Sequence, residues 1–221
     1  MTKAPIFLLV LLFAVPLSVD GVEIYFAAHQ LLVDQGSIVE VGVFLRTEGE
    51  SINAVEGSIL FTSQLLELKE IRDGGSLISL WVKKPEVSSV VQESGKLFFS
   101  GLVPGGFTGE DGHLLTLFFE AQERGQAHIA TVDEQILLND GQGSKASVRQ
   151  APFGIDIQEG APKVDELLPF DDKEPPEDFV PEIVQDPAIF DGKWFLVFAT
   201  QDKGSGIDHY EVQESAEWVK A

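Results

Sequence analysis

The side chains that could bind a ligand fall into one polar loop and a few separate aromatic residues. Asn139 and Asp140 begin the sequence Asn-Asp-Gly-Gln-Gly-Ser, where short oxygen-bearing side chains alternate with flexible glycines. Ca²⁺ takes oxygen ligands from loops of this kind, although the spacing here is not that of an EF-hand. A tight turn uses the same residues, because Asn and Asp side chains accept hydrogen bonds from nearby backbone N–H groups. The turn is favoured, calcium at Asn139 and Asp140 is the alternative, and no other cofactor is expected.

Three aromatic residues, Trp81, Phe107 and Tyr25, could stack on a sugar ring. Such stacking needs a flat, exposed aromatic face beside hydrogen-bonding groups. Packing in the protein interior is the alternative, and it is favoured for Trp81, which lies in an apolar stretch. No predicted strand carries three aromatics at every second position, so binding to crystalline polysaccharide is not expected. Trp81 and Phe107 are the predicted ligand-binding residues, and their exposure decides between the two interpretations.

No arrangement of catalytic residues is evident in the sequence. The chain has no Cys, which excludes thiol nucleophiles, disulfides and Cys-ligated metals. Its four His residues lie near no nucleophile motif of a Ser-His-Asp triad. Glu67, Glu70 and Asp73 are close together, but Lys69 and Arg72 lie between them, as expected for a solvated strand edge. We therefore expect a protein that is not an enzyme.

The chain is strongly acidic. Among 221 residues, 36 Asp and Glu outnumber 15 Lys and Arg, which gives a formal net charge of -21. Electrostatics therefore favours a cation or a basic surface as partner and disfavours nucleic acid. A hydrophobic content of 44%, with 16 Phe, is enough for at least one packed core and excludes wholesale disorder.

Residues 1–21 have the organisation of a secretory signal peptide. Lys3 precedes an apolar run of roughly ten residues, which is too short for a membrane span of about 20 residues. Val19 and Gly21 are small residues at candidate cleavage positions, and we expect cleavage after Gly21. An uncleaved membrane anchor is the alternative. Both predict an exported protein, secreted or on the cell surface, and the absence of Cys favours a bacterial or archaeal source.

Residues 22–157 predict an all-β sandwich, because short runs with apolar residues at every second position are separated by Gly-rich turns. No convincing amphipathic helix is present. Two stretches, residues 97–99 and 114–119, are apolar on both faces. This predicts burial on both sides or, less favoured, packing beside a partner. The predicted strands are residues 38–46, 52–61, 65–71, 77–82, 96–103, 114–121 and 127–132.

The composition changes at residue 158. Residues 158–191 contain six Pro and 11 acidic residues against two Lys. Charge repulsion and proline stiffness predict an extended linker that separates the sandwich from the C-terminal residues. Residues 192–221 predict the truncated start of a second β-domain, with strands at 193–200 and 207–212, because so few strands are not stable alone. The turn between them contains Asp202, for which a turn is again favoured over a metal site.

Residues 53–61, 65–68, 95–101 and 112–119 form four blocks of the first domain that share a pattern of apolar and Gly positions. These blocks resemble the cohesin family, and the resemblance covers about residues 22–157. It rests on apolar and Gly positions, and it implies a jelly-roll β-sandwich of about nine strands, related to bacterial cellulose-binding modules. It also implies a dockerin-like partner. The final strands resemble an immunoglobulin-like or fibronectin-like repeat. Residues 76–81, 105–109 and 139–141 are similar to cohesin-like exported proteins outside cellulosomes.

These observations predict a non-catalytic, exported binding or scaffold module that recognises a protein partner through one face of the sandwich. Polysaccharide binding by the same fold is the alternative, and purely structural spacing is a third interpretation. Contact with a membrane is expected only through an uncleaved signal anchor or a continuation of the chain beyond residue 221.

Overall fold

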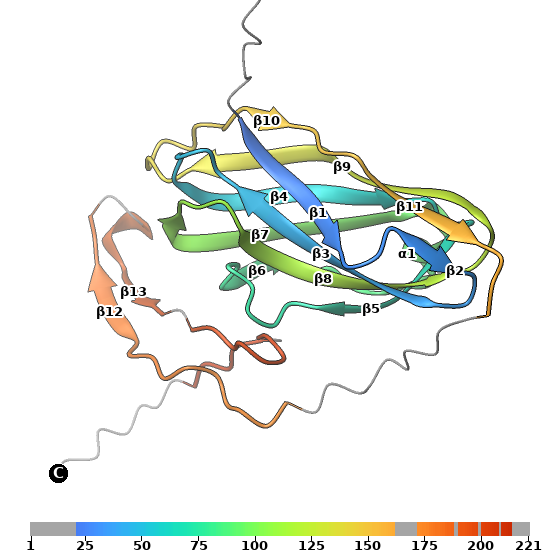
Figure 1. The fold of residues 1–221 in the computed structure, drawn as a ribbon. Coiled ribbons are helices and arrows are strands. Elements are labelled where there is room, and N and C mark those ends of the chain that lie inside the picture. Colours follow the sequence, from blue (N-terminus) through green and yellow to red (C-terminus); the bar gives the residue numbers. More distant parts are fainter. Residues whose placement is uncertain (1–20, 162–171, 188–189, 199, 208, 214–221) are drawn as a thin grey trace, which may run out of the picture.

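The computed structural model describes residues 21–161, 172–187, 190–198, 200–207 and 209–213. Its main body is a sandwich of two β-sheets packed face to face (Figure 1). One sheet has the strand order β10-β1-β3-β8-β5, and the other has the order β2-β11-β9-β4-β7-β6. In the part of the chain that is described, no helix has the length and apolar character needed to cross a membrane.

Most neighbouring strands of the sandwich are antiparallel, and two pairs, β1 with β10 and β11 with β2, are parallel. The five-stranded sheet contains β1 (Val22–Ala28), β3 (Ile38–Arg46), β5 (Leu66–Arg72), β8 (Gly112–Ala121) and β10 (Val148–Arg149). The six-stranded sheet contains β2 (Leu32–Asp34), β4 (Ile52–Phe61), β6 (Leu80–Lys83), β7 (Lys96–Phe107), β9 (Gly125–Leu138) and β11 (Phe153–Gln158).

The core lies between the two sheets and is built by the alternation of side chains along each strand. In β3, Val39, Val41, Val43 and Leu45 are all buried, and the residues between them face outward or toward the sheet margin. The register places Val41 opposite Leu117 of β8, which is also buried. Because side chains alternate with period two, a shift of one residue would expose this whole row.

Aromatic side chains join the sheets across the core. Phe61 of β4 and Phe119 of β8 belong to different sheets, and their ring centroids are 5.1 Å apart. Phe99 of β7 is buried in the same core cluster. Each buried aromatic side chain removes about 150–250 Å² from water, so these residues contribute strongly to the stability of the sandwich. The predicted all-β sandwich is confirmed.

One helix was missed by the sequence analysis. Residues Ser89–Ser94 form the short helix α1, which begins after the N-cap residue Ser88 and ends at Gly95. Gly95 adopts a left-handed conformation with φ 63°, which favours glycine at this position. The helix has no fully buried residue. It therefore leaves no apolar periodicity in the sequence, which is why no helix was expected there.

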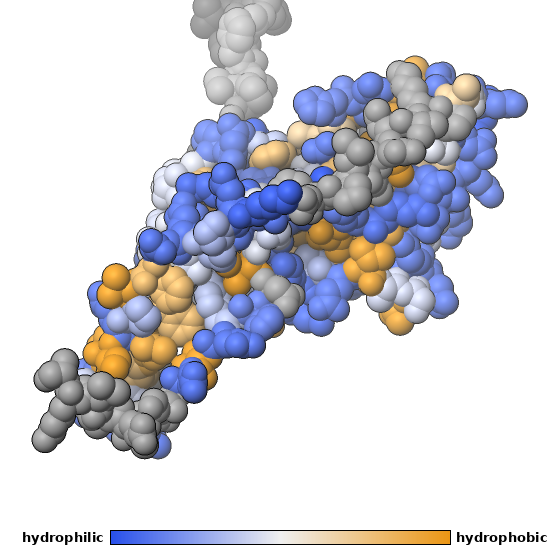
Figure 2. All heavy atoms as spheres, turned by 90° about the horizontal axis from the view of Figure 1, so that it is seen from below, coloured by the Kyte–Doolittle hydropathy of each residue, from blue (hydrophilic) through white to orange (hydrophobic). Residues whose placement is uncertain are grey.

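The described C-terminal residues contain a second, small sheet. Strand β12 (Glu182–Gln185) pairs in antiparallel fashion with β13 (Trp194–Val197), and a 3-10 turn (Phe190–Gly192) precedes β13. Strand β12 lies inside the stretch that the sequence predicts as linker, and the described residues of the expected strand 207–212 form no strand. Exposed hydrophobic residues gather at this end of the molecule (Figure 2), among them Ile183, Trp194, Leu196 and Val197.

After β13 the chain returns to the sandwich. The Tyr210 hydroxyl donates to the backbone oxygen of Ser79, and Lys84 Nζ donates to the backbone oxygen of Ile207. The sequence predicted a linker that holds the C-terminal residues away from the sandwich, whereas these bonds bring them back. The composition of a linker sets its charge and stiffness, and it does not determine where the residues beyond it dock. The predicted signal peptide lies outside the described residues except for Gly21, as do residues 214–221, and the predicted domain boundaries stay predictions.

Candidate functional site

The outer face of the six-stranded sheet carries a band of exposed apolar side chains. Alternation along β7 buries the neighbours of Phe98 and turns Phe98 outward, where it is 44% exposed. On the adjacent strands β4 and β6, Leu60, Leu80 and Val82 are 37%, 42% and 65% exposed. We call this surface the β4–β7–β6 face. It comprises Ala54, Glu56, Leu60, Leu80, Val82, Phe98, Ser100 and Leu102 with Gln135 and Leu137 of the adjoining β9.

The strand register lines up part of this band across four strands. Leu80 of β6 lies opposite Leu102 of β7, which lies opposite Ala54 of β4, and Ala54 lies opposite Leu137 of β9. Directly opposed residues of neighbouring strands point to the same face and touch. A shallow hollow of about 200 Å³ lies over the middle of this row.

Polar residues border the apolar row. Gln135 Nε2 donates to Glu56 Oε1 at 3.4 Å, and Lys96 Nζ forms an ion pair with Asp133 at 2.9 Å. An apolar centre with a polar margin is the arrangement found in protein interfaces. The β4–β7–β6 face therefore has the composition of a surface that binds a macromolecule.

The outer face of the five-stranded sheet is different, because charged groups cover its aromatic rings. Tyr25 stacks on Phe44 with ring centroids 5.4 Å apart, and the Arg46 guanidinium lies 4.6 Å from the Tyr25 centroid. In the same way, Arg72 lies 4.4 Å from the ring centroid of Phe118. Cation–π contacts of this kind satisfy the exposed ring faces within the chain itself.

Ion pairs also cross this second face. Arg46 bonds Glu23 at 2.7 Å and Glu110 at 3.0 Å, and Lys69 bonds Glu67 at 2.9 Å and Glu120 at 2.8 Å. The flanking carboxylates raise the pKa of Lys69 above its usual value. The cationic groups Arg46, Lys69 and Arg72 of this face are thus paired inside the chain, so they are less available to a partner than the exposed side chains of the β4–β7–β6 face.

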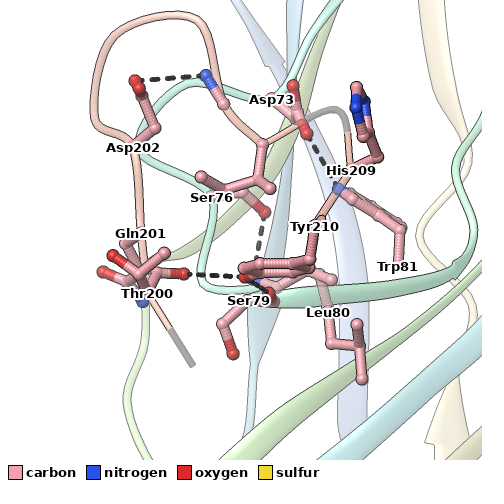
Figure 3. Close-up of a pocket in the computed structure, with 13 residues that line it drawn as sticks. Asp73, Ser76, Ser79, Leu80, Trp81, Thr200, Gln201, Asp202, His209 and Tyr210 are labelled. Carbon is pink, nitrogen blue, oxygen red and sulfur yellow. Dashed lines mark hydrogen bonds between the residues drawn. The ribbon is translucent and has the colours of Figure 1, made fainter. Parts of the chain in front are cut away.

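Trp81, one predicted ligand-binding residue, lies at the edge of the sandwich and is half-buried against the core. Its indole Nε1 donates to Asp73 Oδ2 at 2.8 Å, and Lys84 Nζ lies 3.1 Å from the same oxygen. A cavity of about 310 Å³ lies beside the ring, between the sandwich and the described residues 200–207, 209 and 210 (Figure 3). Tyr210 contributes a second ring to the lining of this cavity.

Phe107, the other predicted ligand-binding residue, ends strand β7 and is also half-buried against the core. Its ring lies over Gly112, where a Cβ atom would approach it to 2.5 Å. In the strand register, Trp81 of β6 lies opposite Gly101, which precedes Phe107 on β7. Each ring packs on its own part of the core, so the structure does not join them into one flat exposed surface.

Asn139 and Asp140 bind neighbouring backbone in the loop after β9. Asn139 Nδ2 donates to the backbone oxygen of Gly105 at 3.1 Å, and Asp140 Oδ1 accepts from the backbone N–H of Gln142 at 2.8 Å. Hydrogen bonds from the Ser144 hydroxyl and from backbone N–H groups lower the pKa of Asp140. Within the described residues, no group of three or more His, Cys, Asp or Glu is placed to hold a metal. Calcium binding at Asn139 and Asp140 stays a prediction.

The residues that make up the apolar row are not among those that the sequence predicts to bind a ligand. Burial is the favoured prediction for residues 97–99, yet Phe98 is 44% exposed, because side chains alternate along β7 and Phe98 points away from the core. The signal was present in the sequence, since a strand that is apolar on both faces is also typical of packing beside a partner. Leu80, Leu102 and Leu137 lie on separate strands, and only the register brings them together.

Comparison with known proteins identifies the fold. A scan against protein-family models found no match for the chain, and a search of curated proteins found none either. Among solved structures, the chain is similar to a non-cellulosomal cohesin from the hyperthermophilic archaeon Archaeoglobus fulgidus. The identity is 18%, the TM-score is 0.50, and the match covers 63% of this chain and 93% of that one.

Two further structures resemble the chain less closely in geometry. A cohesin module of a Clostridium perfringens family 33 glycoside hydrolase is 14% identical, with a TM-score of 0.47, and the match covers 64% of this chain and 100% of that one. A type II cohesin domain from the cellulosome of Acetivibrio cellulolyticus is 14% identical, also with a TM-score of 0.47, and the match covers 62% and 95%. The archaeal structure is the basis for the fold assignment, and by that comparison the sandwich of this chain has a cohesin-like fold.

Proposed function

We propose that this chain is a non-catalytic module that binds a protein partner through the β4–β7–β6 face. The observation that carries the proposal is the aligned row of Leu80, Leu102, Ala54 and Leu137, with Phe98 exposed beside it. The opposite face supports the same choice, because its aromatic rings and the cations Arg46, Arg72 and Lys69 already contact one another or neighbouring carboxylates within the chain.

The partner we propose is a dockerin-like pair of helices. The cohesin-like fold supports this class, since the resemblance of the sequence to cohesins implies it. A helix that presents apolar residues at every third or fourth position fits a flat sheet face with an apolar centre. Because the net charge of this chain is -21, we expect the margin of the partner's binding surface to be basic.

We propose further that the protein is exported and acts outside the cell. The support is the organisation of residues 1–21, in which a short apolar run follows Lys3 and small residues precede the mature chain. The acidic surface suits such a location, because a net charge far from zero keeps an exported protein soluble beside others.

Polysaccharide binding is the less favoured alternative. It would need an exposed aromatic face, whereas Trp81 and Phe107 are half-buried and pack on different parts of the core. A protein interface on the β4–β7–β6 face needs no such aromatic pair, because the Leu and Ala side chains of the apolar row, with Phe98 beside them, already form its apolar centre.

The test compares both ligand classes on the same protein. The full chain is titrated against a panel of dockerin modules, with Ca²⁺ present, and against a panel of soluble polysaccharides. We expect saturable binding to at least one dockerin module, and a loss of affinity of about 30-fold or more in Phe98→Ala or Leu102→Ala, as for residues at the centre of an interface.

The matched control is Val90→Ala. Val90 is an exposed apolar residue of α1, outside the β4–β7–β6 face, so its removal should leave the affinity unchanged. Saturable polysaccharide binding that is lost in Trp81→Ala, with no dockerin binding, would contradict the proposal and support the carbohydrate alternative.

A further inference from the structure

A segment near the C-terminus runs along the free edge of the six-stranded sheet. Strand β6 is the last strand of that sheet and pairs only with β7. Tyr210 bonds the backbone oxygen of Ser79 at 3.0 Å, directly before β6. Lys84, directly after β6, bonds the backbone oxygen of Ile207 at 3.1 Å. The described residues 200–207, 209 and 210, which we call the strap, are therefore attached at both ends of the edge strand.

The strap meets the sandwich through two glycine-containing turns that fit closely together. A Cβ atom on Gly74 would lie 1.7 Å from the backbone oxygen of Gly204, so the two chains approach as only glycine allows. Gly75 N–H donates to the backbone oxygen of Asp202 at 3.4 Å. Gly206 has φ +77° and lies so close to Asp73 that a Cβ would come within 2.3 Å of Oδ1. The contact thus depends on glycine in both turns.

The strap is shaped for this contact by its own hydrogen bonds. Asp202 Oδ1 accepts from the backbone N–H groups of Gly204 at 2.8 Å and of Gly206 at 3.3 Å, which fixes the turn. Asp202 and Thr200 are both buried. Polar residues are stably buried only when they are hydrogen-bonded. A tail that was only loosely attached would leave Thr200 and Asp202 in solvent.

The docked strap closes one side of the cavity beside Trp81. The sandwich supplies Asp73, Leu80 and Trp81, and the strap supplies His209 and Tyr210 (Figure 3). Without the strap, this side of the indole and the edge of β6 would face solvent. An unprotected edge strand is a site where other chains add strands, and proteins commonly cover such edges.

We propose that the strap docks in cis on the sandwich as a cover for the β6 edge and for Trp81. Two described residues of the acidic segment, Asp172 and Glu177, bond the strap at Ser205 N–H and Lys203 Nζ, so this part of the segment lies against the strap and does not hold it away from the sandwich. Any molecule that stacks on Trp81, or that adds a strand to β6, has to displace the strap first.

The test uses a substitution that should expel the strap and leave the sandwich intact. Gly74→Ala introduces a Cβ that collides with Gly204, while the backbone of Gly74 lies outside the positive-φ region and tolerates alanine. Gly154→Ala is the matched control, because a Cβ there has no neighbour closer than 3.9 Å and lies on β11, away from the strap. Both variants are made in the full chain with Trp194→Phe and Trp218→Phe, which leaves Trp81 as the only tryptophan.

The measurement is acrylamide quenching and the emission maximum of Trp81. We expect Gly74→Ala to raise the quenching constant and shift the emission to the red, with Gly154→Ala unchanged. Tyr210→Phe serves as a second variant, since it lies on the strap, outside the core of the sandwich. Loss of its hydrogen bond should shift the docking equilibrium by about fivefold.

Three results would overturn the proposal. Unchanged Trp81 quenching in both Gly74→Ala and Tyr210→Phe would show that the strap does not cover Trp81. If Gly74→Ala unfolds the sandwich and Tyr210→Phe leaves the quenching of Trp81 unchanged, the contact at Gly74 stabilises the sheet edge and does not serve to cover Trp81. A dimeric mass of the parent chain by light scattering, lost in Gly74→Ala, would show that the strap docks on a second copy.

Discussion

Asp73 is a buried carboxylate that holds two neighbouring side chains in place. It is 5% exposed, and its Oδ2 accepts from Trp81 and lies within ion-pair distance of Lys84. Removal of the carboxylate would leave a buried indole N–H and a partly buried ammonium group without their partner. We expect Asp73→Ala to lower the free energy of unfolding by about 2–3 kcal/mol, measured by urea denaturation.

Asp133→Ala is the control for this prediction. Asp133 forms an ion pair with Lys96 on an exposed part of the surface, so its loss should cost less than about 1 kcal/mol. Equal effects of the two substitutions would show that Asp73 is not buried as described.

Tyr25 gives the sandwich a dependence on alkaline pH. Burial, the hydrogen bond to Asp111 and the charge of Asp111 raise the pKa of Tyr25 from 10.0 to about 12. The folded state therefore holds the phenolic proton more tightly than the unfolded state. This contribution to stability is complete below about pH 10 and is lost as the pH rises through about 12.

An ultraviolet titration of the phenolate tests this prediction directly. In Tyr210→Phe, Tyr25 is the only tyrosine, and its absorbance should change near pH 12. Asp111→Asn in the same background should lower the midpoint, because it removes the negative charge. A midpoint near 10 for the folded Tyr210→Phe variant would contradict the described environment of Tyr25.

At the scale of elements, neighbouring residues of strand β7 lie on opposite faces of the sheet. Phe99 is buried in the core, and Phe98, next to it, is exposed on the β4–β7–β6 face. We expect Phe99→Ala to lower the free energy of unfolding by about 3–5 kcal/mol, because it leaves a cavity. Phe98→Ala should cost less than about 1 kcal/mol in the same denaturation experiment. The reverse order would place the strand in the opposite register.

Seven strands of the sandwich, β3 to β9, overlap the strands predicted from sequence, because their apolar residues alternate with period two. Strands β1, β2, β10 and β11 are not among the predicted strands, and β2 and β10 are only three and two residues long. Strands β3 and β4 match the predicted ranges 38–46 and 52–61, since both have one buried face and turns at each end. Helix α1 could not be predicted, because its ends are set by Ser88 and Gly95 and not by an apolar stripe. Strand β12 pairs with β13 although its sequence is that of a linker, and acidic composition gives no sign of such pairing.

At the scale of the whole molecule, net charge should oppose folding. A formal charge of -21 produces self-repulsion that is weaker in the more expanded unfolded state. The screening length falls from about 30 Å at 0.01 M salt to about 8 Å at 0.15 M. We expect Tm to rise by about 2–4 °C between these conditions, measured by calorimetry, which corresponds to about 1 kcal/mol. A fall in Tm would mean that the surface ion pairs outweigh the repulsion.

The candidate surface was less predictable than the fold, because it depends on the pairing of distant strands. No sequence pattern links Leu80, Leu102 and Leu137, which lie on separate strands. Only the register of β6, β7, β4 and β9 aligns them. The docking of the strap was even less predictable, because its contacts join residues that are far apart in the chain, such as Tyr210 and Ser79. The aromatic residues that the sequence singled out, Trp81 and Phe107, pack against the core instead of pairing at a surface.

The most direct test of the proposed function is the hydrogen-exchange footprint of a bound dockerin module on the full chain. Amides of strands β9, β4, β7 and β6 are compared with those of β1, β3, β8 and β5 in the free and bound states. We predict protection centred on β7 and β4, beneath Phe98 and Leu102. Protection confined to the five-stranded sheet, or binding with no protection on either sheet, would contradict the proposed function.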